Sequence, residues 1–273
     1  FVFVRLGLDR LPPLLFATLR FALAASFVLV VARPRLPWRV LLALGLTLGA
    51  AQFGLLFVGM AAGVAPGLAS FLLHNQAFFT IGLGWWVLSE RLRGRQLVGA
   101  GLGALGLGLL IASRPGHAAV FGVVCVLAGA VAAAAGNILL KRAGGADMLG
   151  VVVWSSLFAP IPLLVLSWVV EGRDRIAAGI AAADGMAVFA VFYAAVPSTI
   201  VAYAIWGKLF RLYGTSTVAP FFLLVPVVAV GLSATVLGQG ITPLEAAACA
   251  LILAGLACAV LPALPQTRAV TSS

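Results

Sequence analysis

Residues 119–140 read AVFGVVCVLAGAVAAAAGNILL, a run without one charged side chain. An α-helix that crosses the hydrocarbon core of a bilayer needs about 20 predominantly apolar residues. The stretch therefore predicts a transmembrane helix, and its length can be used to divide the rest of the chain.

The whole chain shares this composition. Of its 273 residues 63% are apolar and only 9% are charged, whereas a typical soluble domain has about 25% charged residues. Lipid is the solvent that tolerates such an apolar surface. We therefore expect an all-α integral membrane protein, with the lipid bilayer as a partner. The net charge of +10 comes from basic residues between apolar runs, so we expect no nucleic-acid partner.

Nine further runs fit a membrane span. Residues 1–8 resemble the second half of a span, so we expect ten transmembrane helices of which the first is truncated. The full spans, numbered two to ten, are predicted at 12–32, 39–60, 65–88, 95–112, 119–140, 149–170, 185–206, 215–237 and 242–262. The connections are too short to hold a soluble domain, and the polar tail 266–273 is expected to be disordered and cytoplasmic.

The basic residues predict an orientation. With a cytoplasmic N-terminus, the cytoplasmic segments carry Arg33, Arg35, Arg39, Arg91, Arg93, Arg95, Lys141, Arg142, Lys208, Arg211 and Arg268. The opposite loops carry only Arg10, Arg114, Arg173 and Arg175. Because cytoplasmic loops attract Lys and Arg, we expect both termini in the cytoplasm.

The two halves of the chain follow one pattern. LSERLRGRQLVGAGLGALGLGLL at 88–110 aligns without gaps with LGQGITPLEAAACALILAGLACAV at 237–260, which places Glu90 on Gln239 and Gly106 on Gly255. Five spans per half is an odd number, so the second half must enter the membrane upside down. We expect inverted repeats at 1–114 and 119–265, a design that places a transport site near the midplane.

The sequence also resembles a known family. FVFVRLGLDRLPPLLFATLRFALA, QFGLLFVGMAAGVAPGLASFLLHNQAFFT, LSERLRGRQLVG and GNILLKRAG are similar to the EamA family of the drug/metabolite transporter superfamily, in its ten-span form. QFGLLFVGM and QAFFT look most like members named as exporters of cysteine and O-acetylserine. The family has Gly-Glu at the end of span four, where this chain has Ser89-Glu90, and the second-half counterpart Gly238-Gln239 lacks the acid.

The resemblance implies a secondary transporter of small metabolites in the bacterial inner membrane, most similar to exporters of amino acids. Efflux of drugs, import of other metabolites and, less favoured, a membrane protein without transport activity are the alternatives. The oligomeric state cannot be predicted from the sequence.

Polar residues in span four are the first candidates for a substrate site. His74, Asn75 and Gln76 lie about 15 Å below Pro66, close to the middle of the bilayer, and Gln52 of span three lies within a turn of the same depth. Polar groups in hydrocarbon are costly, so these side chains either bind a polar substrate or hydrogen-bond neighbouring helices.

Proline and tyrosine residues give further candidates. Pro220 and Pro226 of span nine free backbone carbonyls, which could bind an ammonium group or only kink the helix, and with Pro66 they are candidate helix breaks or gates. In span eight, Tyr193, Ser198 and Tyr203 could line a pocket or pack in the core.

Arg20 lies about 12 Å into span two, where an unpaired guanidinium is expensive. It could hold a substrate carboxylate, although we favour a structural bond to carbonyls of a neighbouring span.

The seven acids are all predicted outside the hydrophobic interiors, so a proton-driven mechanism would have to use His74, and a uniporter or an exchanger with a counter-substrate is the alternative. His74 and His117 are the only histidines, and no nucleophile–base pair or ligand cluster accompanies them. We therefore predict no enzyme activity, no catalytic residue, no metal site and no cofactor.

Overall fold

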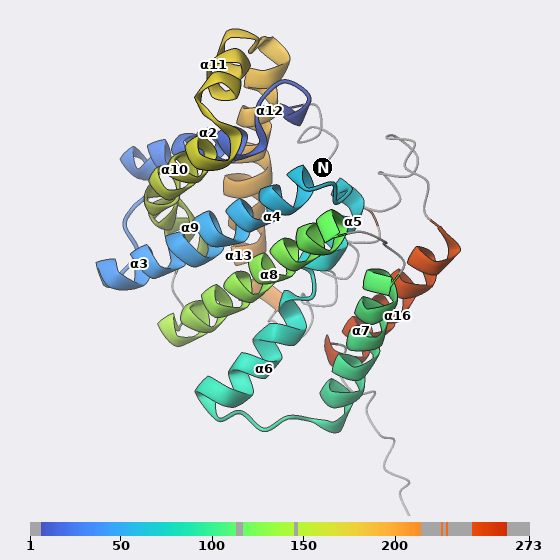
Figure 1. Ribbon diagram of the computed structural model, residues 1–273. Coiled ribbons are helices and arrows are strands. Elements are labelled where there is room, and N and C mark those ends of the chain that lie inside the picture. Colours follow the sequence, from blue (N-terminus) through green and yellow to red (C-terminus); the bar gives the residue numbers. More distant parts are fainter. Residues whose placement is uncertain are drawn as a thin grey trace, which may run out of the picture.

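The computed structural model describes residues 7–112, 117–144, 147–213, 225, 228 and 242–260. Within these residues the regular structure consists of helices, and no β-strand is found (Figure 1). The predicted ninth span, the prolines Pro220 and Pro226, and the tail 266–273 lie outside the described residues.

In the described residues of the first half, the structure has six α-helices and two further helical segments from Pro13 onward. They are α2 (Pro13–Ser26), the 3-10 turn η1 (Phe27–Leu29), α3 (Trp38–Leu44), the π-helix η2 (Gly45–Ala51), α4 (Gln52–Ala61), α5 (Pro66–Leu73), α6 (Gln76–Leu88) and α7 (Gly94–Ala112).

The second half has a similar series. It consists of α8 (His117–Ala143), α9 (Met148–Ser155), the 3-10 turn η3 (Ser156–Phe158), α10 (Pro160–Glu171), α11 (Arg173–Ala181), α12 (Gly185–Ala195), the π-helix η4 (Val196–Val201), α13 (Ala202–Tyr213) and α16 (Pro243–Val260).

Helices occur at each predicted span that the structure describes, but several are interrupted. Trp38–Ala61, Val120–Ala143 and Gly185–Ile205 are long and apolar enough to cross a membrane unbroken, and Met148–Phe158 with Pro160–Glu171 would form a fourth span bent by 44°. The bend falls at Pro160, which has no N–H to continue the helical ladder. The connection before the predicted span eight contains the short polar helix α11 (Arg173–Ala181).

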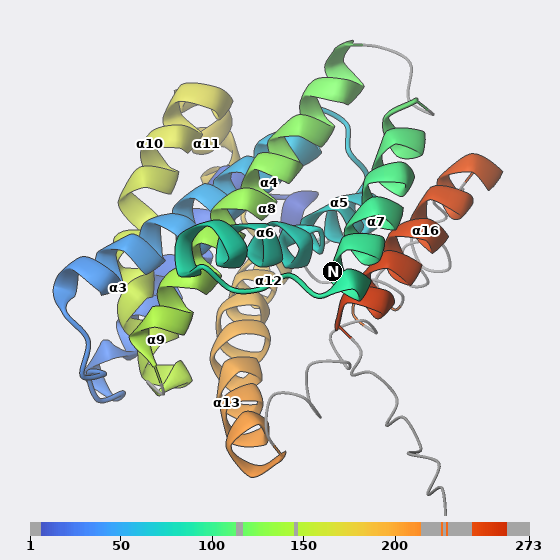
Figure 2. The same ribbon diagram turned by 90° about the horizontal axis from the view of Figure 1, so that it is seen from below.

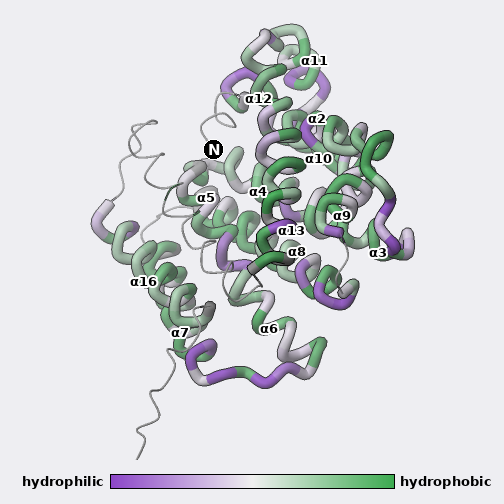
Figure 3. The backbone as a smooth tube through the Cα atoms, turned by 180° about the vertical axis from the view of Figure 1, so that it is seen from behind, coloured by the Kyte–Doolittle hydropathy of each residue, from purple (hydrophilic) through white to green (hydrophobic). Residues whose placement is uncertain are grey.

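The surface supports a lipid environment. Large apolar side chains on the outside of the bundle are strongly exposed, among them Leu29, Trp86, Ile161 and Val169. In Figure 3 the hydrophilic segments gather at helix ends and connections, whereas the helix bodies are mostly hydrophobic. A soluble surface would have polar residues along the helix bodies as well.

Helices α7 and α16 form an antiparallel pair along one side of the bundle (Figure 2). A Cβ added at Gly99 would lie 2.5 Å from Gly255 O, and one added at Gly106 would lie 2.7 Å from Ala248 O. The sequence alignment of the two halves places Gly106 on Gly255 and Gly99 on Ala248. It therefore relates the first contact to the second. Gly99 and Gly106 therefore allow α7 and α16 to pack closely.

One end of the bundle joins the halves through charged groups. Arg10 Nε lies 2.8 Å from the carboxylate of Asp184, the N-cap of α12, and Arg10 holds the pKa of that exposed carboxyl below its usual range. Beside it, Glu171 at the end of α10 accepts hydrogen bonds from the backbone N–H groups of Leu14 (2.6 Å) and Leu15 (3.2 Å) at the start of α2.

Glu171 lies at a helix end, as the sequence predicts, but it is buried there. Only 8% of its surface is exposed, so one of the acids is buried, although it lies at the end of a helix rather than in its middle. Its carboxylate also accepts a hydrogen bond from Ser167 Oγ. A buried carboxylate is tolerated here because the first turn of α2 offers free N–H groups and a positive helix end.

At the opposite end, Lys141 Nζ of α8 lies 2.5 Å from the Glu90 carboxylate, and Arg142 Nη2 donates to Val87 O at 3.2 Å. These contacts join the connection after α6 to the end of α8. Among the described residues, an ion pair thus joins the first half to the second at each end of the bundle.

Candidate functional site

The fourth predicted span is broken where its polar residues occur. Helix α5 ends at Leu73, His74 and Asn75 form a turn, and α6 begins at Gln76. The Asn75 N–H bonds Leu72 O at 3.1 Å, a shorter loop than the α-helical pattern. Ser70 O and Phe71 O share a single backbone donor, the His74 N–H, at 3.3 and 3.2 Å, so the carbonyls at the end of α5 can accept further donors.

His74 and Asn75 supply those donors. Asn75 is buried, and its Nδ2 donates to Leu72 O at 3.0 Å and Phe71 O at 3.4 Å. His74 Nδ1 lies 2.7 Å from Ser70 O, and because a carbonyl only accepts, Nδ1 must carry the hydrogen. The Asn75 amide thus donates within its own span and not to a neighbouring helix, whereas Nε2 of half-buried His74 has no partner among the described residues.

Two polar groups near the break have no hydrogen-bond partner in the described part of the chain. The side-chain amide of half-buried Gln76 is one. The other is Ser70 Oγ, a fully buried hydroxyl one turn before the break. Buried polar groups are normally satisfied, so the Ser70 hydroxyl is an exception among the described residues, whereas half-buried Gln76 and His74 are partly exposed.

A hydrogen-bonded chain ties the break to α8. Thr80 Oγ1 donates to Gln76 O at 2.7 Å and accepts from Asn137 Nδ2 at 3.2 Å. Asn137 of α8 therefore links spans four and six. Gln52 follows η2 in span three, is half-buried and makes no side-chain hydrogen bond to a described residue.

Arg20 forms a second polar group, on α2. Its Nη2 and Nε donate to Thr199 Oγ1 at 2.8 and 3.3 Å, and its guanidinium carbon lies 4.3 Å from the centre of the Phe53 ring and 5.2 Å from that of Phe21. The favoured expectation of bonds to backbone carbonyls was wrong, because the partner is a hydroxyl. Tyr203 is close enough to interact electrostatically with the guanidinium.

The remaining candidates in span eight differ in position. Ser198 is exposed, Tyr203 is 39% exposed, and half-buried Tyr193 packs its ring 6.3 Å from that of Phe189. Thr199, a further polar residue of span eight, is buried beside Pro197, which signals a disturbed helix. No hydrogen bond between described residues joins the Arg20 group to His74, Asn75 or Gln76, so the structure divides the predicted residues into two groups.

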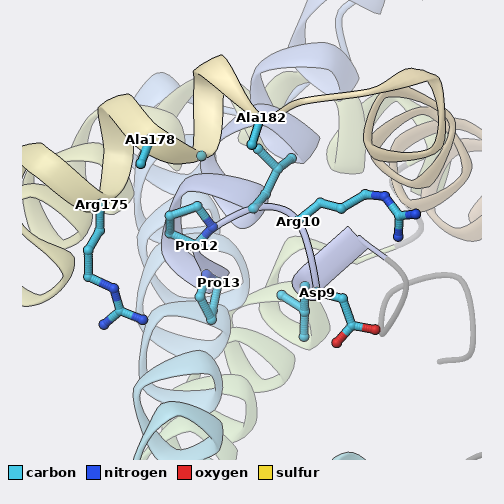
Figure 4. A pocket seen from close by; sticks show the side chains of 10 residues that line it. Asp9, Arg10, Pro12, Pro13, Arg175, Ala178 and Ala182 are labelled. Carbon is cyan, nitrogen blue, oxygen red and sulfur yellow. The ribbon is translucent and has the colours of Figure 1, made fainter.

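A pocket of about 340 Å³ opens at the end of the bundle where Arg10 pairs with Asp184. Pro12 and Pro13 form its centre, with Arg10 and Arg175 extending away from it in different directions (Figure 4). None of the predicted site residues lines this pocket. In the described part of the chain, no group of three or more His, Cys, Asp or Glu side chains could hold a metal ion.

A bundle of apolar helices with breaks and polar side chains at mid-span is typical of a membrane transporter. The model of the EamA-like transporter family matches residues 1–112 and again 120–261. The chain therefore belongs to the EamA-like transporter family. This confirms the predicted family, and with it a multi-pass membrane protein that acts as a transporter and not as an enzyme.

Similar proteins agree with this assignment. A "probable amino-acid metabolite efflux pump" of Salmonella typhimurium is 41% identical over 263 residues, covering 94% of this chain and 88% of that protein. A protein of the same name in Escherichia coli is 39% identical over the same coverage. A solved structure entitled only "Crystal structure of protein" matches the fold with a TM-score of 0.59 at 19% identity, covering 94% of this chain and 90% of that one.

Proposed function

We propose that the protein exports amino acids or related metabolites across the bacterial inner membrane by alternating access. The observation that carries the proposal is the 41% identity, over nearly the whole chain, to a probable amino-acid metabolite efflux pump. Polar groups at the break in span four, without protein partners among the described residues, support a polar rather than an apolar cargo.

Alternating access would follow from ten spans arranged as inverted repeats at 1–114 and 119–265. The family model matches the chain twice, in agreement with this division. The paired contacts Gly99–Gly255 and Gly106–Ala248 obey the shift expected from the aligned halves. The same shift carries the π-helix Gly45–Ala51 onto a stretch that overlaps the π-helix Val196–Val201.

The break in span four is the proposed contact with substrate. Gln76 would supply both amide donors and an acceptor, and His74 would use Nε2 because Nδ1 is bonded to Ser70 O. Gln52 would approach from span three. Pro66, the first residue of α5, and Pro220 and Pro226, outside the described residues, remain candidates for helix breaks or gates.

The driving force would depend on His74. None of the seven acids lies within hydrogen-bonding reach of the break, and Glu171 is held by the start of α2. A proton-coupled exporter would therefore carry its proton on His74, whereas an exchanger would use a counter-substrate. The loop charges support a cytoplasmic position for both termini.

The test is transport by the purified full-length protein in proteoliposomes. Vesicles are loaded with each of a panel of labelled amino acids and O-acetyl-L-serine, and release is followed with and without a pH gradient. We expect release of at least one of these compounds above that of protein-free vesicles. Release of apolar cationic drugs alone would favour the drug-efflux alternative and contradict the proposal, and uptake without release would indicate an import permease.

A further inference from the structure

Arg20 carries a positive charge inside the bundle without an anionic partner. It lies in the middle of α2, about 10 Å beyond Pro13 along the helix. The described residues include all seven acids of the chain, and none of them forms an ion pair with Arg20. A guanidinium at such a depth is normally paired, so this one lacks the usual compensation.

The environment fixes the guanidinium without neutralising it. Thr199 Oγ1 donates its hydrogen to Ala194 O at 2.8 Å, so towards Arg20 it can act only as an acceptor. Both hydrogen bonds from Arg20 end on this one neutral oxygen. The face of the Phe53 ring covers one side of the guanidinium plane.

Several donors of Arg20 stay available. A guanidinium has five N–H groups in a planar fork, and Thr199 engages one on Nε and one on Nη2. The N–H groups of Nη1 and the second N–H of Nη2 have no described partner. Their edge of the fork has the geometry that binds a carboxylate through two parallel hydrogen bonds.

From these observations we infer that Arg20 binds the carboxylate of the transported compound, and that Thr199 is the positioning residue that orients the guanidinium. The substrate class is then a small carboxylate-bearing molecule, with Tyr203 beside the bound group. The inference rests on the proposed function and adds to it the chemical group that the protein recognises.

The π-helix η4 explains why Thr199 can orient the guanidinium of Arg20. In η4 the hydroxyl reaches the carbonyl five residues earlier, Ala194 O, in a segment where Pro197 cannot donate a backbone hydrogen bond. The hydroxyl is therefore held in one orientation, with its acceptor side toward α2. Thr47 of the first π-helix is a matched contrast, because its hydroxyl bonds Ala43 O of its own helix and no charged group.

The experiment compares acids with their carboxamides. L-cysteine, O-acetyl-L-serine and L-leucine, each with its carboxamide, are tested for release from proteoliposomes and for thermal stabilisation of the detergent-solubilised protein. For wild type we expect a preference of about 10- to 100-fold for at least one acid over its amide. Arg20→Gln should lower affinity for that acid by a similar factor and leave affinity for the amide unchanged.

Matched variants separate this role from a structural one. Arg20→Lys keeps the charge but not the planar fork, so its preference should fall between those of wild type and Arg20→Gln. Thr199→Val should reduce the preference, Thr199→Ser should restore it, and Thr47→Val should leave it unchanged. If Arg20→Gln does not fold, an undiminished preference in both Arg20→Lys and Thr199→Val overturns the inference.

The two readouts distinguish failure of the site from failure of the proposed function. Release of amino acids without preference for the carboxylate would keep the function and reject the site. Stabilisation by acids over amides in wild type but not in Arg20→Gln, without release of any probe, would keep the site and reject export. Neither release nor stabilisation by any probe would reject both.

Discussion

At the scale of single residues, Gln76 begins α6 directly after the break in the fourth span, and its amide has no hydrogen-bond partner among the described residues. If that amide binds substrate, Gln76→Leu removes one hydrogen bond, which would weaken affinity by about 5- to 30-fold. Isothermal titration of the purified variant measures this. An unchanged affinity, with or without a change in melting temperature, would return Gln76 to a packing role.

His74 allows a separate test of the driving force. The variant His74→Gln keeps a hydrogen-bonding side chain near Ser70 O but cannot titrate near neutral pH. If His74 carries the coupled proton, the variant should still bind substrate but lose the acceleration of release by a pH gradient. Equal pH dependence of wild type and variant in proteoliposomes would exclude this role.

The candidate residues were predictable to different degrees. His74, Asn75 and Gln76 stand out because polar groups are rare in apolar runs, and the structure places them at a helix break. Which of them caps carbonyls depends on backbone geometry, which no sequence pattern reports. The contact between Thr199 and Arg20 could not be predicted, because a threonine in a span is unremarkable until a charged side chain from another helix is found beside it.

At the scale of helices, the glycine spacing of α7 has a measurable consequence. A Cβ at Gly99 would lie 2.5 Å from Gly255 O, whereas one at Gly101 would meet no atom within 4 Å. Gly99→Leu should therefore separate α7 from α16 and lower the melting temperature, and Gly101→Leu should not. Equal melting temperatures in detergent would mean that the two helices are not packed as described.

The start of α2 offers a second test at this scale. Glu171→Gln would leave one of the two bonded N–H groups without its acceptor and would remove a negative charge from a helix N-terminus. We expect a loss of about 1–3 kcal/mol in unfolding free energy. Glu245→Gln, at the exposed start of α16, is the control and should cost only a few tenths of a kcal/mol. Similar small losses in both would show that burial adds nothing at Glu171.

Span positions were predictable from hydropathy, whereas interruptions within spans were not. The criterion of about 20 consecutive apolar residues predicted α8 and the helices at 38–61, because the thickness of the membrane sets the length of a span. Helix α11 was missed because the sequence RDRIAAGIA is polar and short. The π-helices were not predicted, because the apolar sequence of a span does not distinguish them from an α-helix, although Pro197 gave a local signal for the second.

At the scale of the whole molecule, the ion pairs at the two ends and the bias of basic residues make one prediction about orientation. The ion pair between Glu90 and Lys141 lies at one end of the bundle. The ion pair between Arg10 and Asp184 lies at the other end. The first end carries most of the basic residues, so it should face the cytoplasm. The opposite end, with α11, should then face the periplasm.

Single cysteines test this orientation in a background where Cys125, Cys249 and Cys258 are replaced. Gly94 has open space around it beside the first end, and Ala183 is exposed beside the second. In intact cells a membrane-impermeant maleimide should label Ala183→Cys and not Gly94→Cys, and in inverted vesicles the pattern should reverse. Labelling of both cysteines from the same side would show that Gly94 and Ala183 lie on one side of the membrane, which contradicts the predicted arrangement of the spans. Labelling of Gly94→Cys in intact cells and of Ala183→Cys in inverted vesicles would contradict only the predicted orientation.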